Sequence, residues 1–120
     1  MKVRPIHFVP DVAEAVRFYE ALGLTTDVSS RSGHWIELAA SGGELCLHDA
    51  AIAADGMGRT GVALNFVADE PLEAVEARLK AAGFATEGAI VDQEWGRSLL
   101  VAGPDGSIVQ IDEPDRELYT

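Results

Sequence analysis

The sequence predicts an α+β fold built from two tandem β-α-β-β-β modules. A short motif occurs twice, as FVPD at residues 8–11 and as FVAD at residues 66–69, at an offset of 66 − 8 = 58 residues. Each copy is followed by a segment with the apolar spacing of an amphipathic helix, and then by segments with the composition of strands. A repeat of this length indicates that the chain contains two copies of one supersecondary unit.

The first predicted helix begins after Asp11. An aspartate at this position can accept a backbone N–H as the N-cap residue, and Glu14 three residues later completes a capping-box pattern. Apolar residues then recur at the spacing of one helical face, at Val12, Ala15, Val16, Tyr19 and Leu22. Because Gly23 is suited to end a helix, the pattern predicts a surface helix with one buried stripe.

The second predicted helix begins near Pro71, a residue suited to the first helical turn, which is preceded by Asp69 and Glu70. Its apolar stripe consists of Leu72, Val75, Leu79 and Ala82. Gly83 follows this stripe as Gly23 follows the first one. We therefore expect the second helix to begin and end in the same way as the first.

The segments after each helix have the composition of strands and are separated by turn residues. The expected strands are residues 24–30, 35–39 and 44–48 in the first half, and residues 84–91, 97–102 and 107–112 in the second. The first module then spans about residues 2–50 and the second about residues 61–114, with a linker at about residues 51–60 and an acidic C-terminal tail. Residues 1–120 are expected to form a single domain.

The composition is that of one folded domain. Hydrophobic residues make up 48% of the 120 residues, and a chain of this length buries roughly two-thirds of the surface that its unfolded form exposes. No apolar run approaches the roughly 18 residues that span a bilayer, and the N-terminus lacks the pattern of a secretory signal, so we expect a cytoplasmic protein. Cys46, the only cysteine, has no partner for an intramolecular disulfide and is expected to be a small buried residue.

Acidic residues outnumber basic ones along the whole chain. There are 20 Asp and Glu against 9 Lys and Arg, which gives a net charge of −11, and the acids are scattered rather than gathered into a tail. Such a charge repels phosphate backbones and anionic membranes, so nucleic acid and membrane partners are excluded. The same field would attract a cationic ligand, although an acidic surface also serves solubility alone.

The doubled unit resembles the vicinal oxygen chelate superfamily, which includes glyoxalase I, extradiol dioxygenases, fosfomycin-resistance enzymes and bleomycin-resistance proteins. The resemblance is carried by VPDVAEAVRFYEALGL at residues 9–24 and by GPDGSIVQID at residues 103–112, and it covers the chain from Val3 to about Pro114. It implies two modules with cupped mixed sheets that face each other around a binding cavity. It also implies a homodimer, because family members of this length usually associate about a two-fold axis.

The resemblance places four metal-ligand positions on this chain. In metal-dependent members these positions carry His, Glu or Gln, and counting from the motif aspartates and from Gly106 assigns them to Arg4, Cys46, Val62 and Gln110. An arginine does not coordinate a metal, valine has no donor atom, and one thiolate with one amide does not hold a hard divalent cation. The resemblance therefore implies the fold without the metal centre, and we expect no metal and no other cofactor. Gln110 either orients a polar ligand or pairs with a neighbouring side chain.

Aromatic residues are candidates for ligand contacts. Phe8 and Phe66 hold equivalent positions in the repeat and are expected on the inward face of the first strand of each half. Trp35 and Trp95 lie at or just before the start of a strand in the two halves. Aromatic walls with a few polar groups are typical of a small-molecule site, although core packing explains the phenylalanines equally well.

Polar candidates lie on the closing strand of each half. His48 is expected to share a strand face with Cys46, two residues away. His48 and Asp112 hold equivalent positions, so a His48–Asp112 pair could transfer protons, or both residues could line the cavity rim. Arg4 is expected either to pair with an acid such as Asp112 or Glu37 or to bind an anionic group of a ligand.

These observations favour a metal-independent protein that binds a small molecule by sequestration, as bleomycin-resistance proteins do, with an antibiotic or another aromatic or cationic compound as the ligand. The expected ligand-binding residues are Arg4, Phe8, Trp35, Cys46, His48, Phe66, Trp95, Gln110 and Asp112. The alternative is a lyase, isomerase or dioxygenase-like enzyme that uses a non-standard metal set around His48 or the His48–Asp112 pair for acid–base catalysis. A third hypothesis is an accessory or regulatory dimer with a vestigial pocket.

Overall fold

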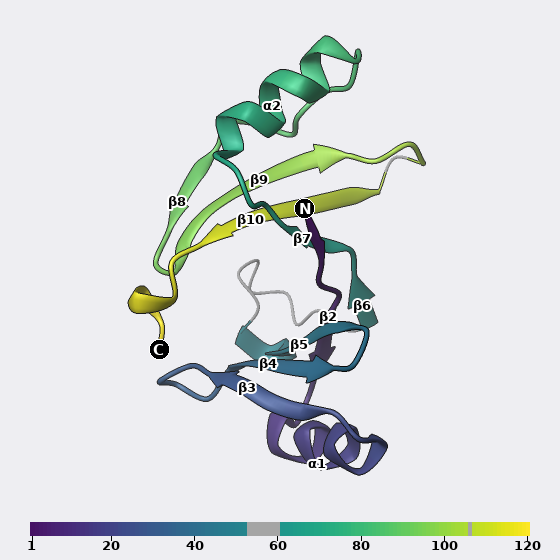
Figure 1. Cartoon of the computed structure of the whole chain (residues 1–120), viewed down its shortest axis with the longest axis vertical. Coiled ribbons are helices and arrows are strands. Elements are labelled where there is room, and N and C mark those ends of the chain that lie inside the picture. Colours follow the sequence, from purple (N-terminus) through teal and green to yellow (C-terminus); the bar gives the residue numbers. More distant parts are fainter. Residues whose placement is uncertain (53–60, 106) are drawn as a thin grey trace. The chain divides into compact units, whose positions relative to one another are not determined.

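The computed structural model describes residues 1–52, 61–105 and 107–120 and contains, within them, two five-stranded mixed sheets, each with a helix on one face (Figure 1). The predicted α+β class is therefore confirmed. The chain divides into two compact units. We call Arg4–Ala63, with Thr120, the N-terminal unit, and Met1–Val3 with Leu64–Tyr119 the C-terminal unit.

The sheet of the N-terminal unit has the strand order β3-β4-β5-β2-β6. Its strands are β2 (Ile6–Val9), β3 (Thr25–Ser29), β4 (Trp35–Ala40), β5 (Gly43–Asp49) and β6 (Gly61–Ala63). β2 and β5 pair in parallel, and the other neighbours are antiparallel. After β5 the short 3₁₀ helix η1 (Ala50–Ile52) follows, and residues 53–60 of the predicted linker lie outside the described residues.

Helix α1 (Val12–Leu22) begins and ends as its sequence predicts. The side chain of Asp11 accepts the backbone N–H of Glu14 at 3.1 Å, and Gly23 takes a left-handed conformation with φ of 108°. The apolar stripe packs against the sheet at Val9, Ile36, Leu38 and Leu47. Leu22 is an exception: it was expected in the buried stripe, but it is the last residue of α1 and is 63% exposed.

The sheet of the C-terminal unit has the strand order β1-β7-β10-β9-β8. Its strands are β1 (Lys2–Val3), β7 (Asn65–Val67), β8 (Val91–Gln93), β9 (Gly96–Ala102) and β10 (Ile108–Pro114). Helix α2 (Leu72–Ala81) packs Leu72 and Val75 against Leu99, Val101 and Ile111. The 3₁₀ helix η2 (Arg116–Leu118) follows β10.

The second helix does not begin as the first one does. Pro71 is the N-cap residue of α2, and its side chain makes no capping hydrogen bond. Asp69, the repeat counterpart of Asp11, instead lies 3.1 Å from the N-terminal amino group of Met1. The prediction of a shared start was therefore wrong, because Asp69 is engaged by a charge from a distant part of the sequence.

The strand predicted over residues 84–91 is also absent from the described structure. Thr86 forms an isolated bridge with Val101, and regular pairing begins only at β8. Gly88 between them has φ of 95°, a left-handed conformation that interrupts an extended strand. The segment after α2 is therefore mostly irregular.

The first strand segment of each half contributes to both sheets. β1 pairs with β7 in the C-terminal unit, whereas β2, only two residues further on, pairs with β5 and β6 in the N-terminal unit. Pro5 lies at the break, where it has no N–H to give to a ladder. This exchange places Arg4 at the point where the chain passes from one sheet to the other.

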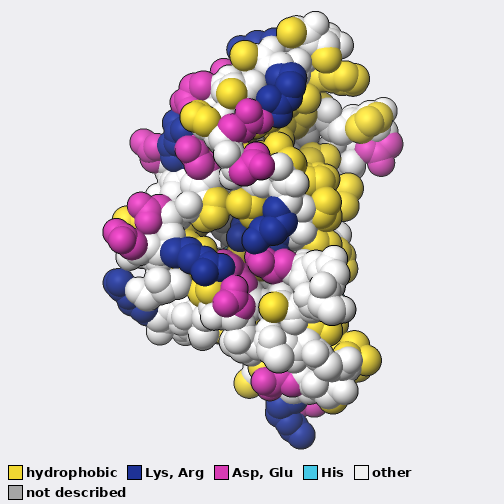
Figure 2. Space-filling model, viewed as in Figure 1, with side chains coloured by type: hydrophobic (Ala, Val, Ile, Leu, Met, Phe, Trp, Pro, Cys, Tyr) yellow, Lys and Arg dark blue, Asp and Glu magenta, His cyan; other side chains and the backbone are white. Residues whose placement is uncertain are grey.

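The described surface carries mixed charges. Figure 2 shows acidic side chains interspersed with basic and hydrophobic ones on the visible face, without one large single-sign patch. Among the helices of the described residues, none has the length and apolar character needed to cross a membrane.

Candidate functional site

The sheet face of the N-terminal unit that lies away from α1 brings together several of the residues predicted from the sequence. Side chains alternate between the two faces of a strand. Because Ile36, Leu38 and Leu47 pack on α1, their neighbours on β4 and β5 point to the opposite face. Pairing of β2 with β5 adds Phe8 beside His48. We call this group the sheet-face cluster: Arg4, Phe8, Trp35, Glu37, Cys46 and His48.

Arg4 and Glu37 form a buried ion pair in the sheet-face cluster. Arg4 Nη1 lies 3.7 Å from Glu37 Oε2, and the two side chains are only 4% and 2% exposed. Arg4 Cζ also lies 5.1 Å from the centroid of the Trp35 ring, within the range of cation–π attraction. Trp35 Nε1 donates to Glu37 Oε2 at 2.9 Å. Arg4 therefore pairs with an acid, one of its two expected roles, and the same carboxylate orients the indole.

His48 is oriented by the main chain. Its Nδ1 lies 2.9 Å from the carbonyl oxygen of Asp49. A carbonyl oxygen only accepts hydrogen bonds, so Nδ1 carries the hydrogen in this contact. The ring centroid lies 5.6 Å from that of Phe8 and 5.8 Å from that of Trp35. In its neutral form, His48 therefore offers Nε2 as a lone-pair acceptor beside two aromatic rings.

Phe8 and Cys46 form the floor of the sheet-face cluster. They are 8% and 0% exposed and pack with Ile6 and Ala50, while Trp35 packs on top of this buried group. Cys46 is fully buried, as predicted for a small packing residue. Trp35 and His48 are only partly buried, so they are the members with surface left for a ligand.

A second polar group lies on the sheet of the C-terminal unit. Gln110 Nε2 donates to Asp112 Oδ1 at 2.8 Å, and Asn65 Nδ2 donates to Asp112 Oδ2 at 2.9 Å. Asp112 is 2% exposed and pairs across the strands with Ser98, which is 5% exposed. Gln110 thus pairs with a neighbouring side chain. Asn65 was missed by the sequence analysis, although an asparagine inside the apolar segment VALNFVA is a signal for a buried polar contact.

Phe66 does not occupy the face that the sequence repeat predicts. Ile6 pairs with Cys46 in one unit, and Asn65 pairs with Gln110 in the other. Since Cys46 and Gln110 are equivalent, the structural offset of the first strands is 65 − 6 = 59 residues, one more than the offset of the sequence motif. A slip of one residue moves each side chain to the opposite face of a strand. Phe66 accordingly packs in the core beneath α2, so its predicted inward position was wrong.

Trp95, another predicted site residue, belongs to the C-terminal unit. Trp95 is partly buried in the turn between β8 and β9, where its carbonyl oxygen accepts the backbone N–H of Asp115 at 2.8 Å. His48 and Asp112 lie in different units, and their proposed proton-transfer pair stays a prediction. The structure therefore assembles Arg4, Phe8, Trp35, Cys46 and His48 in one unit and Gln110 with Asp112 in the other.

The positions that the resemblance assigned to metal ligands do not fit a divalent cation. Arg4 is held in an ion pair, Cys46 is a buried thiol and Gln110 is bonded to a carboxylate. Val62 is 65% exposed, and the offset of 59 makes Ala63 the counterpart of Arg4 instead; neither aliphatic side chain has a donor atom. Throughout residues 1–52, 61–105 and 107–120, no group of three or more His, Cys, Asp and Glu side chains is arranged to hold a metal ion.

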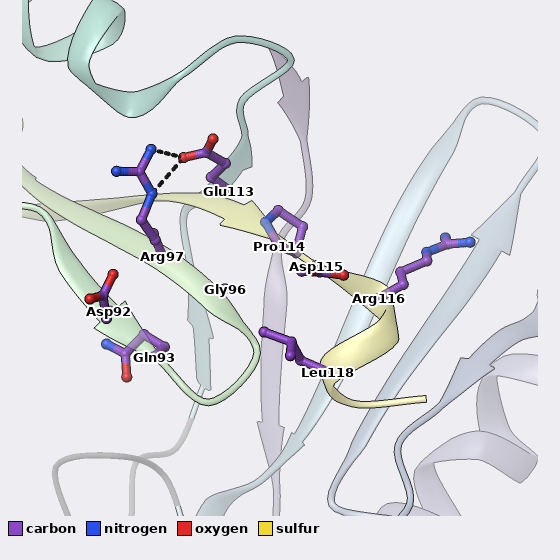
Figure 3. Close-up of a pocket in the computed structure, with 9 residues that line it drawn as sticks. All are labelled: Asp92, Gln93, Gly96, Arg97, Glu113, Pro114, Asp115, Arg116 and Leu118. Atoms are coloured by element: carbon purple, nitrogen blue, oxygen red, sulfur yellow. Dashed lines mark hydrogen bonds and ion pairs between the residues drawn. The ribbon is translucent and has the colours of Figure 1, made fainter.

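An open hollow on the C-terminal unit contains none of the predicted site residues. It lies between the β8–β9 hairpin and the segment after β10, as Figure 3 shows. Arg97 dominates it and is bonded to Glu113 and, at 2.7 and 2.9 Å, to both carboxylate oxygens of Glu73. The hydrogen bonds from Arg97 lower the pKa of Glu73 to about 2. Arg116 points away from these ion pairs (Figure 3). The main charged groups of the hollow, Arg97 and Glu113, are therefore bonded to each other.

Comparisons with known proteins agree with this fold. A family model described as Glyoxalase/Bleomycin resistance protein/Dioxygenase superfamily matches residues 4–111. A NAD-dependent benzaldehyde dehydrogenase from Legionella pneumophila has a similar structure, with a TM-score of 0.74 and 14% identity over 94% of this chain and 99% of that chain. A superfamily member from Vibrio splendidus has a TM-score of 0.62 and 16% identity over 95% and 98% of the two chains. At these identities the similarity shows the fold alone.

An antibiotic binding protein from a Streptomyces species is 26% identical over 92% of each chain, with a TM-score of 0.40. A search of proteins with curated functions found no match to the sequence.

Proposed function

This chain belongs to the Glyoxalase/Bleomycin resistance protein/Dioxygenase superfamily, and from that premise we propose that it binds a small aromatic molecule at the sheet-face cluster without a metal ion. The output of such a protein is affinity rather than turnover, so it would act by sequestration. The membership agrees with the resemblance read from the sequence motifs, whereas the choice among the activities of the superfamily depends on the residues of the site.

The observation that carries the proposal is the ion pair at the first of the family's metal-ligand positions. Arg4 stands at this position and is bound by Glu37, with the pair almost fully buried. A guanidinium there excludes a cation by charge and by the lack of a lone pair. Because Glu37 neutralises Arg4 and also holds the Trp35 indole, the position now supports an aromatic surface.

The chemistry of the sheet-face cluster favours a flat and partly apolar ligand. Trp35 and His48 offer ring faces and edges, and Phe8 and Cys46 beneath them are apolar. Aromatic contacts with a few fixed polar groups are the usual composition of a small-molecule site. The net charge of −11 further favours a neutral or cationic compound over an anionic one.

A thermal-shift screen of antibiotics and aromatic metabolites, with and without EDTA, tests this proposal. A ligand at 100 times its dissociation constant stabilises the folded state by about 2.7 kcal/mol, which corresponds to a rise in Tm of roughly 10 °C for a domain of this size. We expect at least one aromatic compound to raise Tm by the same amount in both conditions. A rise that disappears with EDTA contradicts the proposal.

The two core phenylalanines provide a matched control for the location of the ligand. Phe8→Leu alters the floor of the sheet-face cluster, whereas Phe66→Leu alters the core beneath α2. Both substitutions should lower Tm without ligand, since each removes an aromatic ring that packs in a hydrophobic cluster. Only Phe8→Leu should reduce the ligand-induced rise in Tm. An equal loss in both variants places the ligand elsewhere.

A second candidate function is metal-free acid–base catalysis by His48. It is favoured by one observation: Nδ1 is fixed by the Asp49 carbonyl, which leaves Nε2 of the neutral ring as a potential proton acceptor. If the protein is an enzyme of the lyase or isomerase type, His48→Ala abolishes turnover of a bound compound while its dissociation constant changes little. A His48→Ala variant with unchanged turnover eliminates this candidate.

We propose in addition that the chain is a homodimer, as the superfamily resemblance implies, and that its two units unfold together as one domain. Light scattering after size exclusion gives the mass to compare with 12.8 kDa for one chain. A monomeric mass at micromolar concentration contradicts the dimer. Separate unfolding transitions for the two units contradict the single domain.

A further inference from the structure

We propose that His48 selects the ligand by accepting a hydrogen bond at Nε2, so that the ligand class is a planar aromatic compound with an N–H or O–H group at its edge. This inference rests on the proposed function and narrows it. It assigns to one atom the discrimination between aromatic compounds of similar size and hydrophobicity.

The contact of His48 with the main chain fixes its tautomer. Nδ1 donates to the Asp49 carbonyl oxygen at 2.9 Å, which turns Nδ1 toward the main chain. Nε2 is the ring atom on the far side of the imidazole from this contact. In the residues that the structure describes, no side-chain or backbone group is bonded to Nε2 of His48. Among the described residues, the neutral ring therefore presents one unused acceptor.

The aromatic neighbours of His48 give Nε2 no hydrogen-bond donor. Its ring contacts the rings of Phe8 and Trp35, and Trp35 has already committed its own N–H to Glu37. These aromatic neighbours supply flat apolar surface but no donor for Nε2. A ligand that stacks against them brings its edge to the imidazole, where it can supply the hydrogen bond to Nε2 that no described residue supplies.

A ligand that cannot donate a hydrogen bond to Nε2 should bind more weakly. A ligand without a donor covers Nε2 and removes it from water without replacing the water's hydrogen bond, which leaves a desolvated acceptor unpaired. In a binding site with a fixed acceptor, loss of the ligand's donor therefore lowers the affinity more than the gain or loss of one methyl group does. We expect donor-bearing compounds to bind about tenfold more tightly than their methylated analogues, the weight of one net hydrogen bond.

Two pairs of probes test the inference: indole with 1-methylindole, and phenol with anisole. In each pair the second compound keeps the ring but replaces the donor hydrogen with a methyl group. Dissociation constants for the wild-type chain, measured by titration followed by NMR, should favour indole and phenol by about tenfold. In His48→Phe, which keeps a flat ring but has no acceptor, the two compounds of each pair should bind with about equal affinity.

His34 provides the control. It also contacts Asp49, through Nδ1 at 3.1 Å from Asp49 Oδ2, but it lies outside the sheet-face cluster. His34→Phe should keep the tenfold preference of the wild-type chain. Equal loss of preference in both variants would overturn the inference, because the effect would then come from Asp49 or from a general disturbance of the fold.

A measurement on the wild-type chain covers the case in which His48→Phe does not fold. The ¹⁵N shift of His48 Nε2 reports hydrogen bonding at that atom directly, and it should move when indole is added but not when 1-methylindole is added. Equal binding of both members of each pair overturns the role of His48 and leaves aromatic binding intact. Absence of binding by all four probes at millimolar concentration overturns the proposed aromatic site together with this inference.

Discussion

Replacement of Glu37 by leucine should strongly destabilise the fold, because it leaves the Arg4 guanidinium in a buried position without this carboxylate. At 3.7 Å and an effective dielectric constant of about 20, the attraction between the two charges is about 332/(20 × 3.7) ≈ 4.5 kcal/mol. Removal of one partner of a buried pair costs about 3–5 kcal/mol in measured cases. We therefore expect Glu37→Leu to lower the free energy of unfolding by about 3–5 kcal/mol.

Companion variants separate the charge from the hydrogen bond to the indole. Glu37→Gln keeps an acceptor for Trp35 Nε1 and should lose about 1 kcal/mol less than Glu37→Leu. The double substitution Arg4→Met with Glu37→Leu removes both charges and should recover most of the stability, since paired replacement by apolar residues is often neutral.

The exposed pair of Arg17 and Glu14 is the control for this series. Their side chains are 78% and 67% exposed, so Arg17→Met should cost only about 0.2–1 kcal/mol. The assay is urea denaturation followed by far-UV circular dichroism at pH 7 and 25 °C. A loss below about 1 kcal/mol for Glu37→Leu, or a double variant less stable than Glu37→Leu alone, refutes the reasoning.

The remaining predictions concern the C-terminal unit. Arg97 lowers the pKa of Glu73 from 4.5 to about 2, so the stability that this ion pair supplies is complete above pH 4.5 and is lost as the pH falls through about 2. The difference in free energy of unfolding between the wild-type chain and Glu73→Gln should therefore be constant from pH 5 to 7 and shrink below about pH 4. A difference that grows on acidification contradicts this prediction. Gly96 has φ of 147°, and a Cβ there would overlap the carbonyl oxygen of Glu113. Gly96→Ala should therefore lower the free energy of unfolding by more than Gly88→Ala, which meets no atom within 4 Å and should cost about 1–2 kcal/mol; equal losses in urea denaturation would refute the steric argument.

The start and end of α1 could be read from the sequence because they depend on local chemistry. Asp11 accepts an N–H three residues away, and Gly23 takes a conformation that few other residues adopt. Both contacts are made within one turn of the chain. The prediction that α2 begins in the same way was wrong: Pro71 is its N-cap residue, and Asp69 instead contacts the amino group of Met1, far away in the sequence.

The face of Phe66 could not be read from the motif alone. FVPD and FVAD align at an offset of 58 residues, but the strand pairing is offset by 59. Strand register is set by partners elsewhere in the sheet, and an error of one residue reverses every face assignment. The same slip concealed Asn65, which the pairing of β7 with β10 places opposite Gln110.

Residue chemistry predicted more of the candidate site than strand alignment did. Arginine and valine at positions assigned to metal ligands argue against a metal whatever the register, since Ala63 in place of Val62 leads to the same conclusion. Glu37 was one of the two acids named as examples of a partner for Arg4, and the structure shows that the two side chains form an ion pair. The hydrogen bond from Trp35 to Glu37 was missed by the sequence analysis, although residues two apart on the predicted strand 35–39 share a face.

Fluorescence titration of the Trp95→Phe variant tests most directly whether the sheet-face cluster binds its ligand without a metal. Trp35 is then the remaining tryptophan of the chain, so any quenching reports on the cluster. With the tightest aromatic binder from the thermal-shift screen, we predict saturable quenching with the same dissociation constant in buffer containing EDTA and in buffer without it. Quenching that requires an added divalent metal, or that occurs in Trp35→Phe but not in Trp95→Phe, would contradict the account.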